Sequence, residues 1–182
     1  MSDAGTTEAA ATPPVPPEPV YTPGQRSEIR ALHRSARGLA VLLAVVCVAT
    51  FVTGRMVIEG TTGIDHFLGV ALTGMAGSGL GALSSLLVRY VAGLTLEDGL
   101  RCPPAAEGEL YDRRIAFAML MRPVLGVLIA PLVVAGVALF FKQHEDFKGS
   151  IDAVTVVAFV GGLYAKSVIE AAKNLFKAVF RA

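Results

Sequence analysis

Tryptophan is absent from this chain of 182 residues, and charged residues make up only 17% of it, whereas apolar residues make up 53%. Soluble globular domains carry about 25% charged residues. The formal net charge of +1 excludes a strong electrostatic field of either sign and gives no support to nucleic-acid binding. The composition is instead typical of an integral membrane protein.

The chain also lacks the motifs of the common enzyme and metal-site classes. It contains no Gly-x-Ser-x-Gly or His-Glu-x-x-His sequence, and its histidines and cysteines do not cluster. The longest polar segment between apolar stretches, 89–114, is too short for an independent domain. We therefore expect no enzyme, no cofactor and no metal site. We interpret the acidic and histidine residues near the span ends as solvated loop residues (Glu59, Asp65, His66, His144, Glu145 and Asp146).

Four apolar stretches are long enough to cross a bilayer, which takes roughly 20 apolar residues. They cover about 38–58, 66–88, 123–141 and 150–168. Three flanking segments are amphipathic and suit the headgroup zone, about 23–37, 110–121 and 169–182. The expected fold is all-α, a four-helix transmembrane bundle with interfacial amphipathic helices in residues 23–182. Residues 1–22, rich in Ala, Thr and Pro, are expected to be disordered.

Short sequence motifs and single prolines predict where helices start and bend. Thr22-Pro-Gly-Gln25 is typical of a capped helix start. Pro123 is expected at the start of the third span, and Pro131 is expected to kink that span. No broken helix is expected in the middle of the membrane, and no charge lies at the centre of any span, which argues against an ion-coupled transporter.

Basic residues predict the orientation of the bundle. Of the 16 Lys and Arg residues, thirteen fall on the side of the two termini, and three fall on the other side (Arg55, Lys142 and Lys148). Since basic residues favour the cytoplasmic side, both termini are expected in the cytoplasm, with the chain in the bacterial inner membrane. Contacts with anionic headgroups on that side are expected from eight residues (Arg26, Arg30, Arg34, Arg37, Arg122, Lys173, Lys177 and Arg181). Lys166 and Glu170, four residues apart, are expected to form an interfacial ion pair.

Small residues recur every four positions in the second span, at Gly69, Thr73, Gly77, Gly81 and Ser85. Such a flat helix face lets another backbone approach closely. The fourth span offers a matching surface at Gly161 and Gly162. Two interpretations stay open at this point: packing within one chain, or an interface between copies.

Three sequence segments together are similar to a loose family of bacterial membrane modules. They are Gly-Ala-Leu-Ser-Ser-Leu-Leu at 81–87, Arg-Pro-Val-Leu-Gly at 122–126, and Phe-Val-Gly-Gly-Leu-Tyr at 159–164 with its amphipathic tail. The resemblance covers about residues 66–182. It implies a membrane architecture and no particular activity.

We therefore expect a non-enzymatic multi-pass membrane protein that acts by helix association, as a homo-oligomer or as the membrane subunit of a larger assembly. Its partners would be lipid, itself or another membrane protein. The alternative is an oligomeric ion channel or membrane-permeabilising effector, in which hydroxyl residues line the pore (Thr73, Ser78, Ser84 and Ser85).

Overall fold

The computed structural model describes residues 21–60, 64–102, 109–140 and 150–180. Within these ranges the chain is helical apart from short connecting segments, one of which holds a pair of two-residue strands, so the predicted all-α class is confirmed. The elements are α1 (Pro23–Gly60), α2 (Ile64–Ala92), β1 (Leu94–Thr95), β2 (Arg101–Cys102), α3 (Arg113–Phe140), α5 (Ile151–Leu163) and α6 (Ala165–Phe180). The strands pair antiparallel, with Leu94 opposite Cys102.

Three of the described helices, α1, α2 and α3, are long and apolar enough to cross a membrane. A fourth crossing is present if α5 and α6 are counted as one bent span. The length and composition of the helices therefore agree with the first three of the expected spans. The fourth differs in a way described below.

The first helix is continuous, which corrects the division into an amphipathic helix at 23–37 and a span from 38. The expected cap is present, because the Thr22 backbone N donates to Gln25 Oε1 at 3.0 Å and Gln25 N donates to Thr22 Oγ1 at 3.4 Å. The helix then runs 38 residues without interruption. Gly38, at the expected boundary, costs only about 1 kcal/mol relative to alanine within a helix, which is too little to end it.

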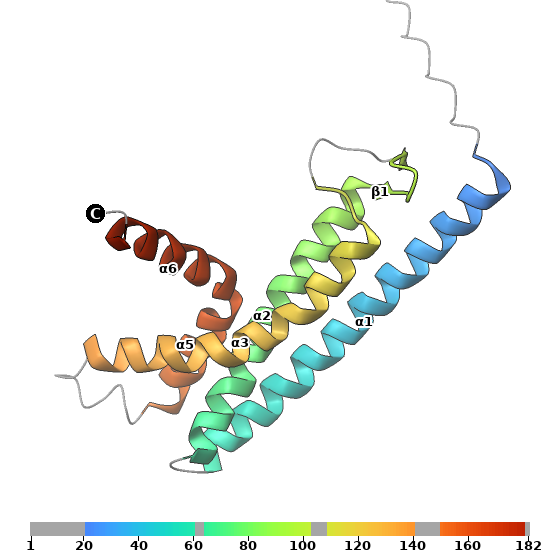
Figure 1. The fold of residues 1–182 in the computed structure, drawn as a ribbon. Helices are drawn as coiled ribbons and strands as arrows, with labels where there is room; N and C mark the ends of the chain where they lie inside the picture. The colour runs from blue at the N-terminus through green and yellow to red at the C-terminus, as the bar shows by residue number, and fades with distance from the viewer. Residues whose placement is uncertain (1–20, 61–63, 103–108, 141–149, 181–182) are drawn as a thin grey trace, which may run out of the picture.

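The third helix is also longer than expected and corrects the position of Pro123. α3 begins at Arg113 and continues through both Pro123 and Pro131, so Pro123 lies inside a helix and the expected separate segment at 110–121 merges with the span. A proline in a helix interior removes one backbone hydrogen bond, but Pro123 and Pro131 are both buried and held by packing. Figure 1 shows α3 changing direction between its two ends, and Pro131, where the sequence predicts a kink, lies within it.

The fourth apolar stretch is broken, which corrects the expected continuous span at 150–168. α5 ends at Leu163, Tyr164 adopts φ −95° and ψ 12°, and α6 starts at Ala165 with its axis bent by 68° from that of α5. Glycine is a weak helix former, and Gly161-Gly162 lies just before the break. The expected amphipathic tail therefore starts at Ala165 instead of at 169.

Helix α2 lies at the centre of the fold and packs against α1, α3 and α5 (Figure 1). At one end, a core of buried residues joins α1, α2 and α3 to the connection that holds the strands (Leu32, Ala36, Leu43, Ala82, Leu86, Leu94, Leu96, Cys102, Tyr111 and Met119). At the other end a smaller core joins α1, α2, α3 and α5 (Ile58, Val70, Ala130, Val154 and Ala158). The apolar side of residues 23–37 thus contacts the chain's own connection.

Candidate functional site

The small residues of α2 lie against neighbouring helices of the same chain. A Cβ built on Gly54 of α1 would lie 2.6 Å from Thr73 Oγ1 and 2.9 Å from the Gly69 carbonyl oxygen. One built on Gly69 would lie 2.8 Å from Ile58 Cγ1. Ordinary Cβ contacts are longer than 3.4 Å, so α1 and α2 approach at a distance that only glycine permits.

The next residues of the ladder contact α5. A Cβ on Gly77 would overlap the carbonyl oxygen of Phe159, and one on Gly81 would lie 3.2 Å from that of Leu163. Gly162 faces the backbone of Gly74, and a Cβ on Gly161 would lie 3.1 Å from Val133 of α3. The structure therefore brings the two small-residue surfaces together within one chain.

The hydroxyl groups expected to line a pore are engaged in hydrogen bonds to backbone carbonyls. Thr73 Oγ1 donates to the Gly69 carbonyl at 2.9 Å, and Ser85 Oγ donates to that of Gly81 at 2.9 Å. Ser78 Oγ donates across the helix interface to the Arg122 carbonyl at 2.6 Å. Thr73 and Ser78 are buried, whereas Ser84 is exposed.

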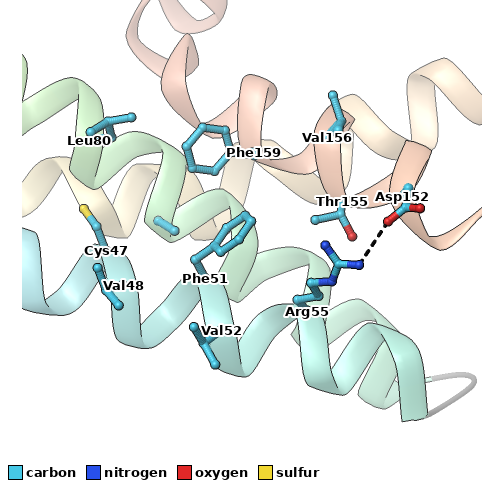
Figure 2. Close-up of a pocket in the computed structure, with 11 residues that line it drawn as sticks. Cys47, Val48, Phe51, Val52, Arg55, Leu80, Asp152, Thr155, Val156 and Phe159 are labelled. Atoms are coloured by element: carbon cyan, nitrogen blue, oxygen red, sulfur yellow. Dashed lines mark hydrogen bonds and ion pairs between the residues drawn. The ribbon is translucent and has the colours of Figure 1, made fainter.

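An apolar groove opens between α1 and α5, with α2 as its floor (Figure 2). Its volume is about 420 Å³. The α1 wall holds Cys47, Val48, Phe51 and Val52, the α5 wall holds Thr155, Val156 and Phe159, and Ala76 and Leu80 come from α2. Val48, Val52 and Val156 are more than half exposed. The groove is thus an open hydrophobic surface that lies beside the central helix α2, between α1 and α5.

One end of this groove, named here the α1–α5 groove, carries an ion pair. Arg55 Nη2 lies 3.2 Å from Asp152 Oδ1, and Arg55 Nε lies 2.7 Å from Glu59 Oε1. Deeper in the groove the rings of Phe51 and Phe159 meet edge to face, with centroids 5.6 Å apart. Figure 2 shows the charged pair and the two rings bridging the same space between the helices. The groove is therefore apolar along its length and polar at one mouth.

A second hollow, named here the cationic cleft, lies between α2, α3 and α6. Two adjoining cavities of about 350 and 470 Å³ share Ser84, Ser85, Arg122 and Lys166 in their linings. Arg122 is half-buried, and its Nη1 donates to Ser85 Oγ at 2.7 Å. The bend at Tyr164 brings Lys166 and Ser167 of α6 to this cleft.

Two carboxylates lie beside the cleft. Glu109 pairs with Arg89 at its rim, and Glu170 Oε1 lies 3.6 Å from Lys166 Nζ, the pair that the sequence spacing predicted. Both partners in the second pair are mostly exposed. Among the residues that the structure describes, no carboxylate lies within ion-pair distance of Arg122.

The other basic residues expected at headgroups are exposed on α1 and α6. Arg26, Arg30, Arg34 and Arg37 follow one side of α1, where His33 Nδ1 lies 2.7 Å from Tyr90 Oη of α2. Lys173 and Lys177 are exposed on α6, and Arg181 lies outside the described residues.

No group of three or more potential metal ligands occurs in the part of the chain that the structure describes. His144, Glu145 and Asp146 fall outside that part. Cys47 and Cys102 are both free thiols, in separate places.

Sequence reasoning missed both hollows. Arg55 and Asp152 are 97 positions apart, and nothing local to either residue shows that they meet. The cationic cleft depends on the break at Tyr164, for which the two preceding glycines are the only signal in the sequence. No family model, curated protein or solved structure matches this chain.

Proposed function

We propose that this chain is a multi-pass protein of the bacterial inner membrane that acts by helix association and not by catalysis. The α1–α5 groove is the contact surface, and an apolar membrane helix is its occupant. The unequal distribution of basic residues supports a cytoplasmic position for both termini.

The observation that carries the proposal is the open apolar groove between α1 and α5, with α2 as its floor. α2 contacts α1, α3 and α5, and between α1 and α5 its residues Ala76 and Leu80 form the groove floor. The apolar floor and apolar walls suit packing with a further apolar helix. The ladder is used within the chain, so association between chains needs a different surface, and the groove provides one.

Permeation is the alternative function, and the structure gives it less support. A pore needs polar groups that face a continuous opening. Thr73, Ser78 and Ser85 instead donate to carbonyls within the bundle. If the protein is a channel, ions should cross liposomes that contain the purified protein. Ion flux across a range of voltages would contradict the association proposal.

Cysteine crosslinking in native membranes tests the groove directly. In a background with Cys47→Ser and Cys102→Ser, Val52→Cys places a thiol in the groove, and Ala49→Cys places one on an exposed α1 position outside it. A short thiol-reactive crosslinker should join Val52→Cys to a partner. The adduct has twice the chain's mass for a homo-oligomer and another defined mass for a separate subunit.

The matched variant separates specific packing from random collision in the bilayer. Ala49→Cys should crosslink several-fold less than Val52→Cys at equal expression. Equal yields from both positions, or no adduct from Val52→Cys, would exclude the groove as the contact surface.

A further inference from the structure

We infer that the cationic cleft between α2, α3 and α6 is a binding site for a single phosphate group. The ligand is either the headgroup of an anionic phospholipid or a free phosphate. The inference is independent of the association proposed above, because the cleft and the α1–α5 groove share no lining residue.

The first observation is the state of Arg122. This guanidinium is half-buried in an apolar helix, and the only side chain to which it donates in the described structure is Ser85, at 2.7 Å. An arginine presents five donors in a rigid fork that matches the oxygen atoms of a phosphate. Ser85 Oγ itself donates to the Gly81 carbonyl at 2.9 Å, so the hydroxyl is fixed and orients the guanidinium. Donors that remain free on Arg122 therefore face a cavity.

The second observation is that further donors converge on the same cavity from another helix. Lys166 and Ser167 of α6 line it beside Ser84 of α2. Lys166 and Ser167 belong to the first turn of α6. The backbone N–H groups of a first turn lack partners within the helix and favour an anion. Three cations (Arg89, Arg122 and Lys166) face two carboxylates (Glu109 and Glu170) across the cleft and its rim. The net charge of these five groups is therefore about +1, which a bound anion would neutralise.

The geometry also explains which headgroup chemistry fits. The cleft lies where the α5–α6 bend leaves the apolar bundle, and its lining joins polar residues to Leu125 and Leu163. A phospholipid would place its phosphodiester group against Arg122 and Lys166. The start of its acyl chains would then lie against Leu125 and Leu163. A free phosphate would use the polar residues alone.

Binding by the purified full-length protein in phosphatidylcholine nanodiscs tests the inference. The two probes are a water-soluble short-chain phosphatidylglycerol and inorganic phosphate, each titrated while the thermal unfolding midpoint is followed. Arg122→Gln should weaken the binding of whichever probe the site takes by about tenfold or more, the usual scale for losing a charge-assisted hydrogen bond. Lys166→Gln should weaken it several-fold.

Two matched variants on the same helix make the result specific. Lys173→Gln removes an exposed charge of the same sign outside the cleft and should leave the affinity within about twofold. Glu170→Gln frees Lys166 from its carboxylate partner and should tighten binding. Because Lys166 is mostly exposed, its variant keeps the proposal testable if Arg122→Gln does not fold.

Each outcome decides the matter. Binding of the phosphatidylglycerol alone, with this dependence on Arg122 and Lys166, assigns a lipid headgroup, and binding of inorganic phosphate with the same dependence assigns free phosphate. Binding of neither probe would overturn the inference. So would equal losses in Lys166→Gln and Lys173→Gln, because general surface charge would then account for the affinity.

Discussion

Gly162 of α5 lies directly against Gly74 of α2, so closely that a Cβ on Gly162 would overlap the Gly74 carbonyl oxygen. Gly74 in turn faces Gly126 and Ala130 of α3. Three helices therefore meet at one point with almost no side-chain volume between them, and this contact holds α3 and α5 on the central helix.

Gly162→Ala should destabilise the protein by about 1–3 kcal/mol, the usual cost of inserting a methyl group into a well-packed interior. Gly136→Ala is the matched control, because a Cβ there would meet no heavy atom within 4 Å. Its effect should be neutral or slightly stabilising, as alanine is the better helix former. Unfolding of both variants in the same detergent gives the comparison. Equal midpoints for the two variants would mean that the three-helix contact is absent.

Ser78→Ala should lower the free energy of unfolding by about 0.5–1.5 kcal/mol, the typical net value of a buried hydrogen bond. The substitution removes the bond of 2.6 Å to the Arg122 carbonyl, which joins α2 to α3. Ser84→Ala removes only a bond within α2, from an exposed hydroxyl to the Gly81 carbonyl, and should change stability by less than about 0.5 kcal/mol. A larger loss in Ser84→Ala than in Ser78→Ala would contradict the assignment.

The helical core of this fold was largely predictable, whereas its breaks were not. Hydrophobic length identified α1, α2 and α3, and the spacing of Thr22 and Gln25 identified the start of α1, since these signals act within a few residues. The break at Tyr164 is different. Gly161 and Gly162 are its only local signal, and the contact of Gly162 with Gly74, between residues 88 positions apart, leaves no local pattern.

The candidate sites were predictable only as separate residues. Arg122 and Lys166 stood out as cations near span ends, and both line the cationic cleft. Their convergence needs the bend between α5 and α6, and the α1–α5 groove needs the gap beside α2. The cationic cleft and the α1–α5 groove both result from how the other helices are arranged around α2.

Stability should fall at alkaline pH through Tyr21. Burial, with a smaller contribution from the neighbouring Cys102, raises the pKa of the Tyr21 phenol above its ordinary value of 10.0. A raised pKa in the folded state means that the contribution is complete below pH 10 and is lost as the pH rises through the folded-state pKa. The unfolding midpoint of the wild type should therefore drop above about pH 10.

Tyr21→Phe should reduce this alkaline loss, because the variant has no phenol to ionise. Tyr164→Phe, which removes an exposed phenol, should leave it unchanged. Parallel pH series of the three proteins provide the measurement. An alkaline loss in Tyr21→Phe as large as that of the wild type would assign the effect to other groups.

The proposed orientation predicts where introduced thiols can be labelled. In a background without Cys47 and Cys102, Glu59→Cys should react with a membrane-impermeant maleimide added outside spheroplasts. Arg34→Cys, at the other end of α1, should react only after permeabilisation. The reverse pattern would place the termini outside the cell and contradict the orientation derived from the basic residues.

The 13 residues of α5 have a consequence for the surrounding lipid. At 1.5 Å per residue they extend about 20 Å, against a hydrocarbon layer of about 30 Å. A bilayer that holds α5 across its depth must compress beside it, because hydrophobic mismatch of this kind is relieved by local deformation of the lipid. The chain should therefore favour shorter acyl tails as neighbours.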